Sequence, residues 1–600
     1  MKKNHLSINS ENILPIIKKW LYSEKDIFLR ELVSNATDAI NKLKLINAAN
    51  KDSFRIDIQI DKDNKTISIS DNGIGMNEEE VKKYIAQIAF SGAEDFLEKY
   101  KTHDEKDQII GHFGLGFYSA YMVANKVEVD TRSYIEKEAP VLWSCDGSSE
   151  YFLSKSKRTD TGTTIILHIN KENEEYLDKN VLLKILNNFC LFLPYPIYLN
   201  DQHINNEYPL YLKSPSECTE KEYLEFYRKL YPLNPDPIFW VHLNVDYPFN
   251  LKGILYFPKI GQSFDANKNA IKLFCNRVFV SDNCKDLLPD FLMILQGAID
   301  SPDIPLNISR SFLQMDSTVR KLSSHISKKI SDRLSSLYKL DKEKFTSYWP
   351  SIETVIKLGI LQDEKFYERS KSFLIWKNTD SNWTTIEDYI SANEVKKDKV
   401  FYTHENTDSS HFLDLYRSKQ IEVLYTNHYI DVAILNFLEK KLSVHFQRID
   451  GGIDPSILDT SKEKNVLDSD GRTQSSKLAE FIKNALSIED LDVEAKSLAS
   501  EAIPGFIMLK EEERRLRDYL HLTGNESFNM PTKKTFVVNT NSSLVNNAHK
   551  LHNKYPEIAK DLIKQIYDLS LLSQKEMEAE EISNFVSRSN SILEKLVSIN

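Results

Sequence analysis

Apolar and polar residues alternate along several short segments in the first third of the chain. This period of two is the pattern of half-buried β-strands. The segments are FRIDIQI (54–60), KTISIS (65–70), KVEVDTR (126–132), VLWS (141–144), YFLS (151–154) and TGTTIILHI (161–169). Because several lie at hairpin spacing, we expect a mostly antiparallel sheet.

Two segments beside these strands have helical periodicity instead. Residues 25–50 predict one long helix, and residues 77–90 predict a second. The second helix has Asn77 at the N-cap and Glu80 at the capping-box position. Helices and strands together predict a two-layer α/β domain over residues 1–205.

The remaining chain predicts two further domains. A polar, proline-bearing stretch near 200–235 suggests a boundary. We expect an α/β middle domain at 206–489, including a long loop at 450–476, and an α+β C-terminal domain at 490–600. The last helix carries one apolar stripe: Ile582, Phe585, Val586, Ile592, Leu593, Leu596 and Val597. That stripe fits packing within its own domain as well as a dimer interface.

Composition narrows the class of protein. A chain of 600 residues is too long for one hydrophobic core. Its net charge of −11 argues against a general nucleic-acid binder. The five cysteines include no CxxC pair, and no apolar run reaches about 18 residues. We therefore expect a cytoplasmic protein without structural zinc, disulfides or a membrane span.

Polar side chains form a stripe on the first predicted helix. Glu31, Asn35, Asp38 and Lys42 are spaced four, three and four residues apart, which places them on one face. On this helix alone, a solvated stripe with ion pairs is the favoured interpretation.

Glycine-rich segments after that helix change the interpretation. Six of the 17 glycines lie between Gly73 and Gly116. Asp71 ends a strand before NGIGM, and GHFGLGFYSAYMVA (111–124) leads from glycines into an apolar helical run. Such a loop offers backbone N–H groups to a phosphate. Neither the third glycine of a dinucleotide fingerprint nor a Walker Gly-Lys-Ser/Thr is present.

These segments carry a family resemblance. DIFLRELVSNATDA, DNGIGM, GHFGLGFYSA and GTTIILHI resemble the N-terminal ATPase domain of the bacterial ninety-kilodalton heat-shock chaperones. That domain belongs to a class shared with gyrase, histidine kinases and MutL. IDSPDIPLNISRSFLQ (299–314) resembles the middle domain of the same chaperones. The resemblance covers essentially the whole chain and is thin beyond residue 350.

The resemblance implies roles for single residues. Asp71 would accept a hydrogen bond from the adenine amino group, with help from Thr163. Asn35 would bind the magnesium ion that bridges the phosphates, and Glu31 would orient and deprotonate the attacking water. Arg310 would reach the γ-phosphate from the middle domain, with Gln314 nearby.

Further residues are expected around the nucleotide, and residues 91–116 are expected to form a lid over it. The loop of Gly114, Leu115, Gly116 and Phe117 would cradle phosphate with its N–H groups. The other expected nucleotide contacts are Asp38, Lys42, Gly75 and Met76.

The sequence departs from the family pattern just before the lid. The family usually has IAKSGT where this chain has IAFSGA, so Phe90 replaces a lysine and Ala93 a threonine. Loss of one charge-assisted phosphate contact costs about 1.5–3 kcal/mol if nothing compensates. We expect weaker ATP binding or slower turnover, unless another cation takes over. Alternatively, Phe90 simply packs at the end of its helix.

The resemblance implies an ATP-driven homodimeric chaperone with Mg²⁺-dependent, slow ATPase activity. Lid closure and docking of the N-terminal domains would drive the remodelling of partly folded clients, with other chaperones as further partners. The alternatives are another ATPase of the same class and a nucleotide-sensing scaffold that barely hydrolyses, which Phe90 suggests.

Overall fold

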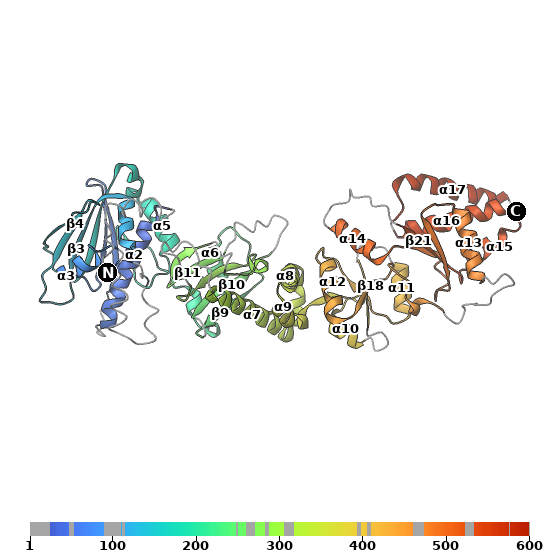
Figure 1. Cartoon of the computed structure of the whole chain (residues 1–600), viewed down its shortest axis with the longest axis horizontal. Helices are drawn as coiled ribbons and strands as arrows, with labels where there is room; N and C mark the ends of the chain where they lie inside the picture. Colours follow the sequence, from blue (N-terminus) through green and yellow to red (C-terminus); the bar gives the residue numbers. More distant parts are fainter. Residues whose placement is uncertain are drawn as a thin grey trace, which may run out of the picture. The chain divides into compact units, whose positions relative to one another are not determined.

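The chain divides into two compact units, residues 1–333 and 334–600. The computed structural model describes residues 24–46, 53–88, 90, 110, 114–247, 250–259, 271–282, 287–304, 317–392, 398–404, 410–459, 473–522, 533–574 and 576–598. Figure 1 labels the elements.

The first unit begins with an eight-stranded sheet of order β5-β4-β3-β6-β2-β1-β7-β8. Every neighbouring pair is antiparallel except β1 and β7. The strands are β1 (Ile56–Asp61), β2 (Thr66–Asp71), β3 (Ala124–Arg132), β4 (Val141–Cys145), β5 (Phe152–Lys155), β6 (Gly162–Ile169), β7 (Ile197–Leu199) and β8 (Gln202–His203). The alternation of the sequence therefore predicted β1 to β6 and their antiparallel pairing, but not the short strands β7 and β8.

Helices cover one face of this sheet (Figure 1). They are α2 (Ile27–Ile46) and α5 (Lys179–Phe189), whose apolar faces share one core with the inward residues of the strands. The opposite face carries mostly polar residues, such as Ser68 and Ser70. The predicted two-layer α/β fold is confirmed for this part of the chain.

Two shorter helical elements lie near the glycine-rich segments. The first, α3 (Glu78–Tyr84), has the predicted capping box between Asn77 and Glu80, but it ends well before residue 90. The second, η3 (Gly116–Met122), is a 3₁₀ helix. A short 3₁₀ helix has a weak dipole, so η3 would attract a phosphate mainly through its free backbone N–H groups.

A second sheet in the first unit has the order β12-β11-β13-β10-β9. Its strands are β9 (Phe239–Val245), β10 (Leu251–Phe257), β11 (Lys272–Cys275), β12 (Val278–Ser281) and β13 (Gln296–Asp300). Helix α6 (Glu220–Leu230) contributes to the aromatic core beside it. The long helix α7 (Ser317–Leu340) runs across the division between the units.

In the part of the second unit that the structure describes there are three small sheets and many helices. The sheets are β14 (Ile375–Lys377) with β15 (Trp383–Thr385), β17 (Leu424–Tyr425) with β16 (Lys399–Thr403) and β18 (His445–Arg448), and β19 (Leu491–Lys496) with β21 (Lys534–Asn539) and β20 (Gly505–Met508). The helices are α8 (Lys342–Gln362), α9 (Glu364–Ser370), α10 (Ile386–Ala392), α11 (Ser410–Ser418), α12 (Asp431–Leu442), α13 (Gln474–Leu486), α14 (Glu511–Leu522), α15 (Ser543–Leu551), α16 (Pro556–Ser573) and α17 (Ala579–Ser598). Among the described residues, no helix has the length and apolar character needed to cross a membrane.

The final helix, α17, exposes much of its apolar stripe. Ile592 is buried, whereas Ile582, Val586, Leu593 and Val597 are 43%, 49%, 61% and 78% exposed. Packing within the unit therefore accounts for only part of the stripe.

Candidate nucleotide site

Helix α2 carries the polar stripe that the sequence singled out. Glu31 and Asp38 are buried, at 3% and 6% exposure, and Asn35 and Lys42 are half-buried. A solvated stripe would leave these side chains in water, so that interpretation is wrong. Buried carboxylates need partners, and each of these two has one.

Glu31 is paired with the neighbouring Arg30. Oε1 of Glu31 accepts hydrogen bonds from Nη2 of Arg30 at 2.9 Å and from Nε at 3.3 Å. Arg30 is 1% exposed, and its guanidinium lies 5.6 Å from the ring centroid of Phe189 on α5. The pair thus fixes the orientation of the Glu31 carboxylate.

The second oxygen of Glu31 lies against the glycine loop. A Cβ added to Gly116 would be 2.5 Å from Oε2 of Glu31. At Gly114, φ is +65° and an added Cβ would lie within 3.0 Å of backbone atoms of Phe90. Position 114 therefore needs glycine, whereas a side chain at Gly116 would displace the Glu31 carboxylate. Leu115 and Phe117 are held beside α2 by the same loop.

Asp38 and Lys42 lie further along α2. Oδ1 of Asp38 accepts a hydrogen bond from the backbone N–H of Ile110 at 2.7 Å. Burial lowers the pKa of Lys42, and the negative charges of Asp38 and Glu80 oppose that effect. Asp38 therefore anchors the C-terminal part of the predicted lid to the helix.

Asp71 ends β2 on the buried side of the sheet. It is 7% exposed, and its Oδ1 accepts a hydrogen bond from Gly73 N at 2.8 Å. Burial raises the pKa of Asp71 to about 7, against the stabilising effect of the Gly73 amide, the Arg158 charge and the Thr163 amide. The carboxylate is thus an acceptor held in a nearly dry environment.

The loop after Asp71 returns to α2. Ile74 N donates to the carbonyl oxygen of Ala39 at 3.0 Å, and a Cβ on Gly73 would lie 2.5 Å from the Ala39 carbonyl carbon. The loop, which includes Gly75 and Met76, therefore joins the Asp71 end of the sheet to α2.

Thr131 lies in the same row as Asp71 and Thr163, although it was not predicted from the sequence. Thr131 on β3, Thr163 on β6 and Asp71 on β2 form one row across the three strands. The Thr131 hydroxyl lies 2.9 Å from the Thr163 hydroxyl and accepts from Met76 N at 2.9 Å. The available signal was the inward position of Thr131 in KVEVDTR, two residues beyond the apolar Val129.

Phe90 packs as an aromatic residue. Its ring stacks on Tyr84, with centroids 6.0 Å apart, and Nζ of Lys83 lies 5.1 Å from the Phe90 centroid. The packing interpretation is confirmed, and a cation lies over the ring.

Three predicted features fall wholly or mostly outside the described residues. Arg310 and Gln314 lie in the undescribed stretch 305–316. Of the predicted lid, residues 110 and 114–116 are described.

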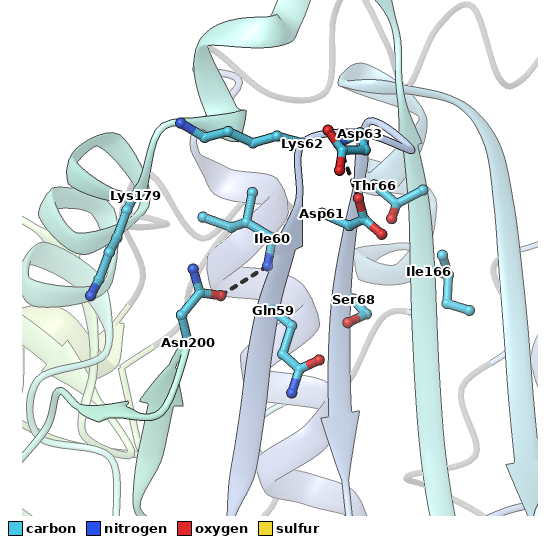
Figure 2. Close-up of a pocket in the computed structure, with 10 residues that line it drawn as sticks. All are labelled: Gln59, Ile60, Asp61, Lys62, Asp63, Thr66, Ser68, Ile166, Lys179 and Asn200. Carbon is cyan, nitrogen blue, oxygen red and sulfur yellow. Dashed lines mark hydrogen bonds between the residues drawn. The ribbon is translucent and has the colours of Figure 1, made fainter.

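A separate surface pocket of about 690 Å³ lies near the β1–β2 turn (Figure 2). Gln59, Asp61, Ser68 and Ile166 are among its lining residues, and none of the predicted site residues lines it. Asp61 accepts hydrogen bonds from the backbone of its own turn. This pocket is distinct from the α2–β2–β6 site.

The fold and the arrangement of α2, β2 and β6 define a class of ATPase. Residues 23–171 match the family model described as histidine kinase-, DNA gyrase B- and HSP90-like ATPase. Residues 197–600 match the model described as Hsp90 protein. The chain therefore belongs to the Hsp90 family.

Similar curated proteins agree with this assignment. A protein named Chaperone protein HtpG from Porphyromonas gingivalis is 42% identical over 576 residues, covering 91% of this chain and 84% of the relative. A Bacteroides fragilis relative with the same name is 42% identical over 577 residues, with the same coverage. A Buchnera aphidicola relative, also so named, is 30% identical over 633 residues and covers 99% of both chains.

The family and the fold together give the activity. The chain is an ATP-dependent molecular chaperone with ATPase activity. The match over 197–600 decides against another ATPase of the same class.

Proposed function

We propose that α2, β2 and β6 form the ATP site, with the base at Asp71 and the phosphates along α2. The main support is the row Thr131–Thr163–Asp71, which ends in a buried carboxylate beside the loop on α2. A buried acceptor of this kind selects a ligand with a matching N–H donor, as the adenine amino group is.

At the phosphate end, Glu31 orients and deprotonates the attacking water. Its contact with Arg30 supports this role, because a fixed carboxylate can align a water at low reorganisation cost. The N–H groups of Gly114–Phe117 bind phosphate, and Asp38 and Lys42 border the site. Arg310 contacts the γ-phosphate with Gln314 nearby, which couples hydrolysis to the arrangement of the domains.

Asn35 supplies the protein oxygen for Mg²⁺. Among the described residues, no group of three His, Cys, Asp or Glu side chains converges as a metal site. The half-buried amide one helical turn from Glu31 suits Mg²⁺, which is typically bound through few protein oxygens plus phosphate and water. When bound, the ion neutralises phosphate charge.

ATP binding closes the lid at 91–116 and docks the N-terminal domains of a homodimer in a slow cycle. Dimerisation through residues 490–600 is supported by the exposed apolar residues of α17. The cycle remodels partly folded client proteins in the cytoplasm, with other chaperones as further partners.

Phosphate release tests this function. Wild-type protein should release phosphate from ATP in a Mg²⁺-dependent manner, and Glu31→Ala should bind ATP but release no more phosphate than background. Glu31→Gln is the matched variant, because it keeps the volume beside Gly116. Wild-type release no faster than that of Glu31→Ala would contradict the proposed role of Glu31.

A further inference from the structure

The loop between β5 and β6, residues 156–161, is fastened to the polar face of the large sheet. Ser156 Oγ donates to the Asp130 carboxylate, and Arg132 Nη1 donates to the carbonyl oxygen of Thr159. The loop then enters β6 at Gly162, where φ is +129° and an added Cβ would be 2.1 Å from the carbonyl oxygen of Asp71. The end of the loop therefore enters β6 directly beside the end of β2.

Arg158 ties this loop to three strands. Its Nη1 donates to the Thr164 hydroxyl on β6 at 2.6 Å, and its Nη2 donates to the carbonyl oxygen of Asp71 on β2 at 3.3 Å. A longer contact of 3.5 Å joins Nη1 to the carbonyl oxygen of Asp130 on β3. Its Nε also donates to the carbonyl oxygen of Asp160 within the loop, at 2.9 Å. The guanidinium is thus held in one place by its planar set of donors.

The contacts of Arg158 with Asp130 and Thr164 lie one register position from the row Thr131–Thr163–Asp71. Asp130, Thr164 and Ser70 are aligned across β3, β6 and β2, next to the row Thr131–Thr163–Asp71. Successive residues of a strand point to opposite faces, so the guanidinium and the Asp71 carboxylate lie on opposite sides of the sheet.

The charge of Arg158 also acts on Asp71. Charged residues on the elements around Asp71 are Arg30, Glu31, Asp38, Lys42 and Lys44 on α2, Asp57 and Asp61 on β1, Lys126, Glu128, Asp130 and Arg132 on β3, and Arg158 itself. The charge that opposes the rise in the pKa of Asp71 is that of Arg158. Without it, a larger fraction of Asp71 would be protonated at neutral pH.

We propose that Arg158 is a positioning residue of the base site, which holds the ends of β2 and β6 from the opposite face of the sheet. The inference rests on the proposed role of Asp71 in binding adenine. Arg158 itself does not touch the nucleotide.

The test measures ATP affinity by isothermal titration between pH 6 and 9. Arg158→Gln should weaken binding about tenfold at pH 7, the size expected for losing one charged hydrogen-bonding group. Its affinity should recover as pH rises, because the midpoint of its pH profile moves upward relative to wild type. Arg158→Lys keeps the charge and should retain the wild-type midpoint. In steady-state assays, KM for ATP should rise in Arg158→Gln while kcat stays unchanged.

Arg132→Gln is the matched control. It removes a bond to the same loop, but its side chain makes no hydrogen bond to Asp71 or Thr164, so its ATP affinity should stay within about twofold of wild type. The phosphates of ATP also titrate in this pH range, but they do so equally for every variant. Differences in affinity between variants at one pH therefore do not contain this contribution. Thermal melting checks that each variant is folded.

Two results would overturn the inference. One is Arg158→Gln with wild-type affinity at every pH; the other is a uniform loss with an unchanged midpoint, matched by Arg132→Gln. If Arg158→Gln unfolds, Arg158→Lys decides. Because this variant keeps the positive charge, an upward shift in the midpoint of its pH profile would overturn the inference. Normal ATP binding by Asp71→Asn would instead reject the adenine assignment on which the inference depends.

Discussion

The two ends of the proposed ATP site are built differently. The base end is a row of side chains on adjacent strands, Thr131–Thr163–Asp71, whose positions follow from sheet register. The phosphate end combines one helix with a glycine loop, and its carboxylate is held by the buried Arg30–Glu31 pair. In the proposed site, the register of the sheet determines where the adenine is bound, whereas the helix and the glycine loop place the Glu31 carboxylate beside the phosphates.

The largest expected effect is on turnover, from Glu31→Gln. Loss of the general base should reduce kcat by about 10²–10⁴, while ATP affinity stays within about threefold of wild type. Phosphate release and isothermal titration measure the two quantities. Glu78→Gln, an exposed glutamate on α3, is the control and should leave both unchanged. If Glu31→Gln lost ATP affinity as strongly as turnover, binding and hydrolysis could not be assigned to different ends of the site.

Asp71→Asn should have the next largest effect, on binding. The amide cannot replace a charged acceptor held by Gly73 N, so affinity for ATP should fall about 100-fold or more. Titration at protein concentrations suited to weak binding gives the affinity. Because the phosphate end is intact, any residual turnover at saturating ATP should keep a kcat near that of wild type. A large fall in kcat at saturation would contradict this separation.

Thr131→Val should weaken the base end without removing a charge. It leaves Met76 N without its acceptor, which should lower the free energy of unfolding by about 1–3 kcal/mol and reduce ATP affinity about tenfold. Thr131→Ser keeps the hydroxyl and should retain most of the affinity. Urea unfolding and titration report the two effects. Equal behaviour of the valine and serine variants would exclude the hydroxyl as the cause.

Phe90→Lys should have the smallest effect, at the phosphate end. The added cation should tighten ATP binding about threefold, less than a full charge-assisted contact, because the stack with Tyr84 is lost. Phe90→Leu removes the ring without adding charge, so its affinity should not increase. If both variants bind ATP alike, charge at residue 90 does not limit affinity.

The features that were predicted from the sequence depend on nearby residues. The stripe on α2, the capping box of Asn77 and Glu80 and the strand ending at Asp71 all follow from local spacing. Thr131 and Arg158 were not predicted, because their contacts depend on the order of strands in the sheet. Strand β6 lies between β3 and β2, and the spacing of residues along the sequence does not reveal this order. The buried pair was also missed, since burial of Arg30 depends on α5, about 150 residues further along the chain.

The most direct test of the central claim is ATP titration into Asp71→Asn and Glu31→Gln side by side. We predict that Glu31→Gln binds ATP with near wild-type affinity, whereas Asp71→Asn gives no binding heat at the same concentrations. Wild-type affinity in Asp71→Asn, or loss of binding in Glu31→Gln, would contradict the assignment of the base to Asp71 and of hydrolysis to Glu31.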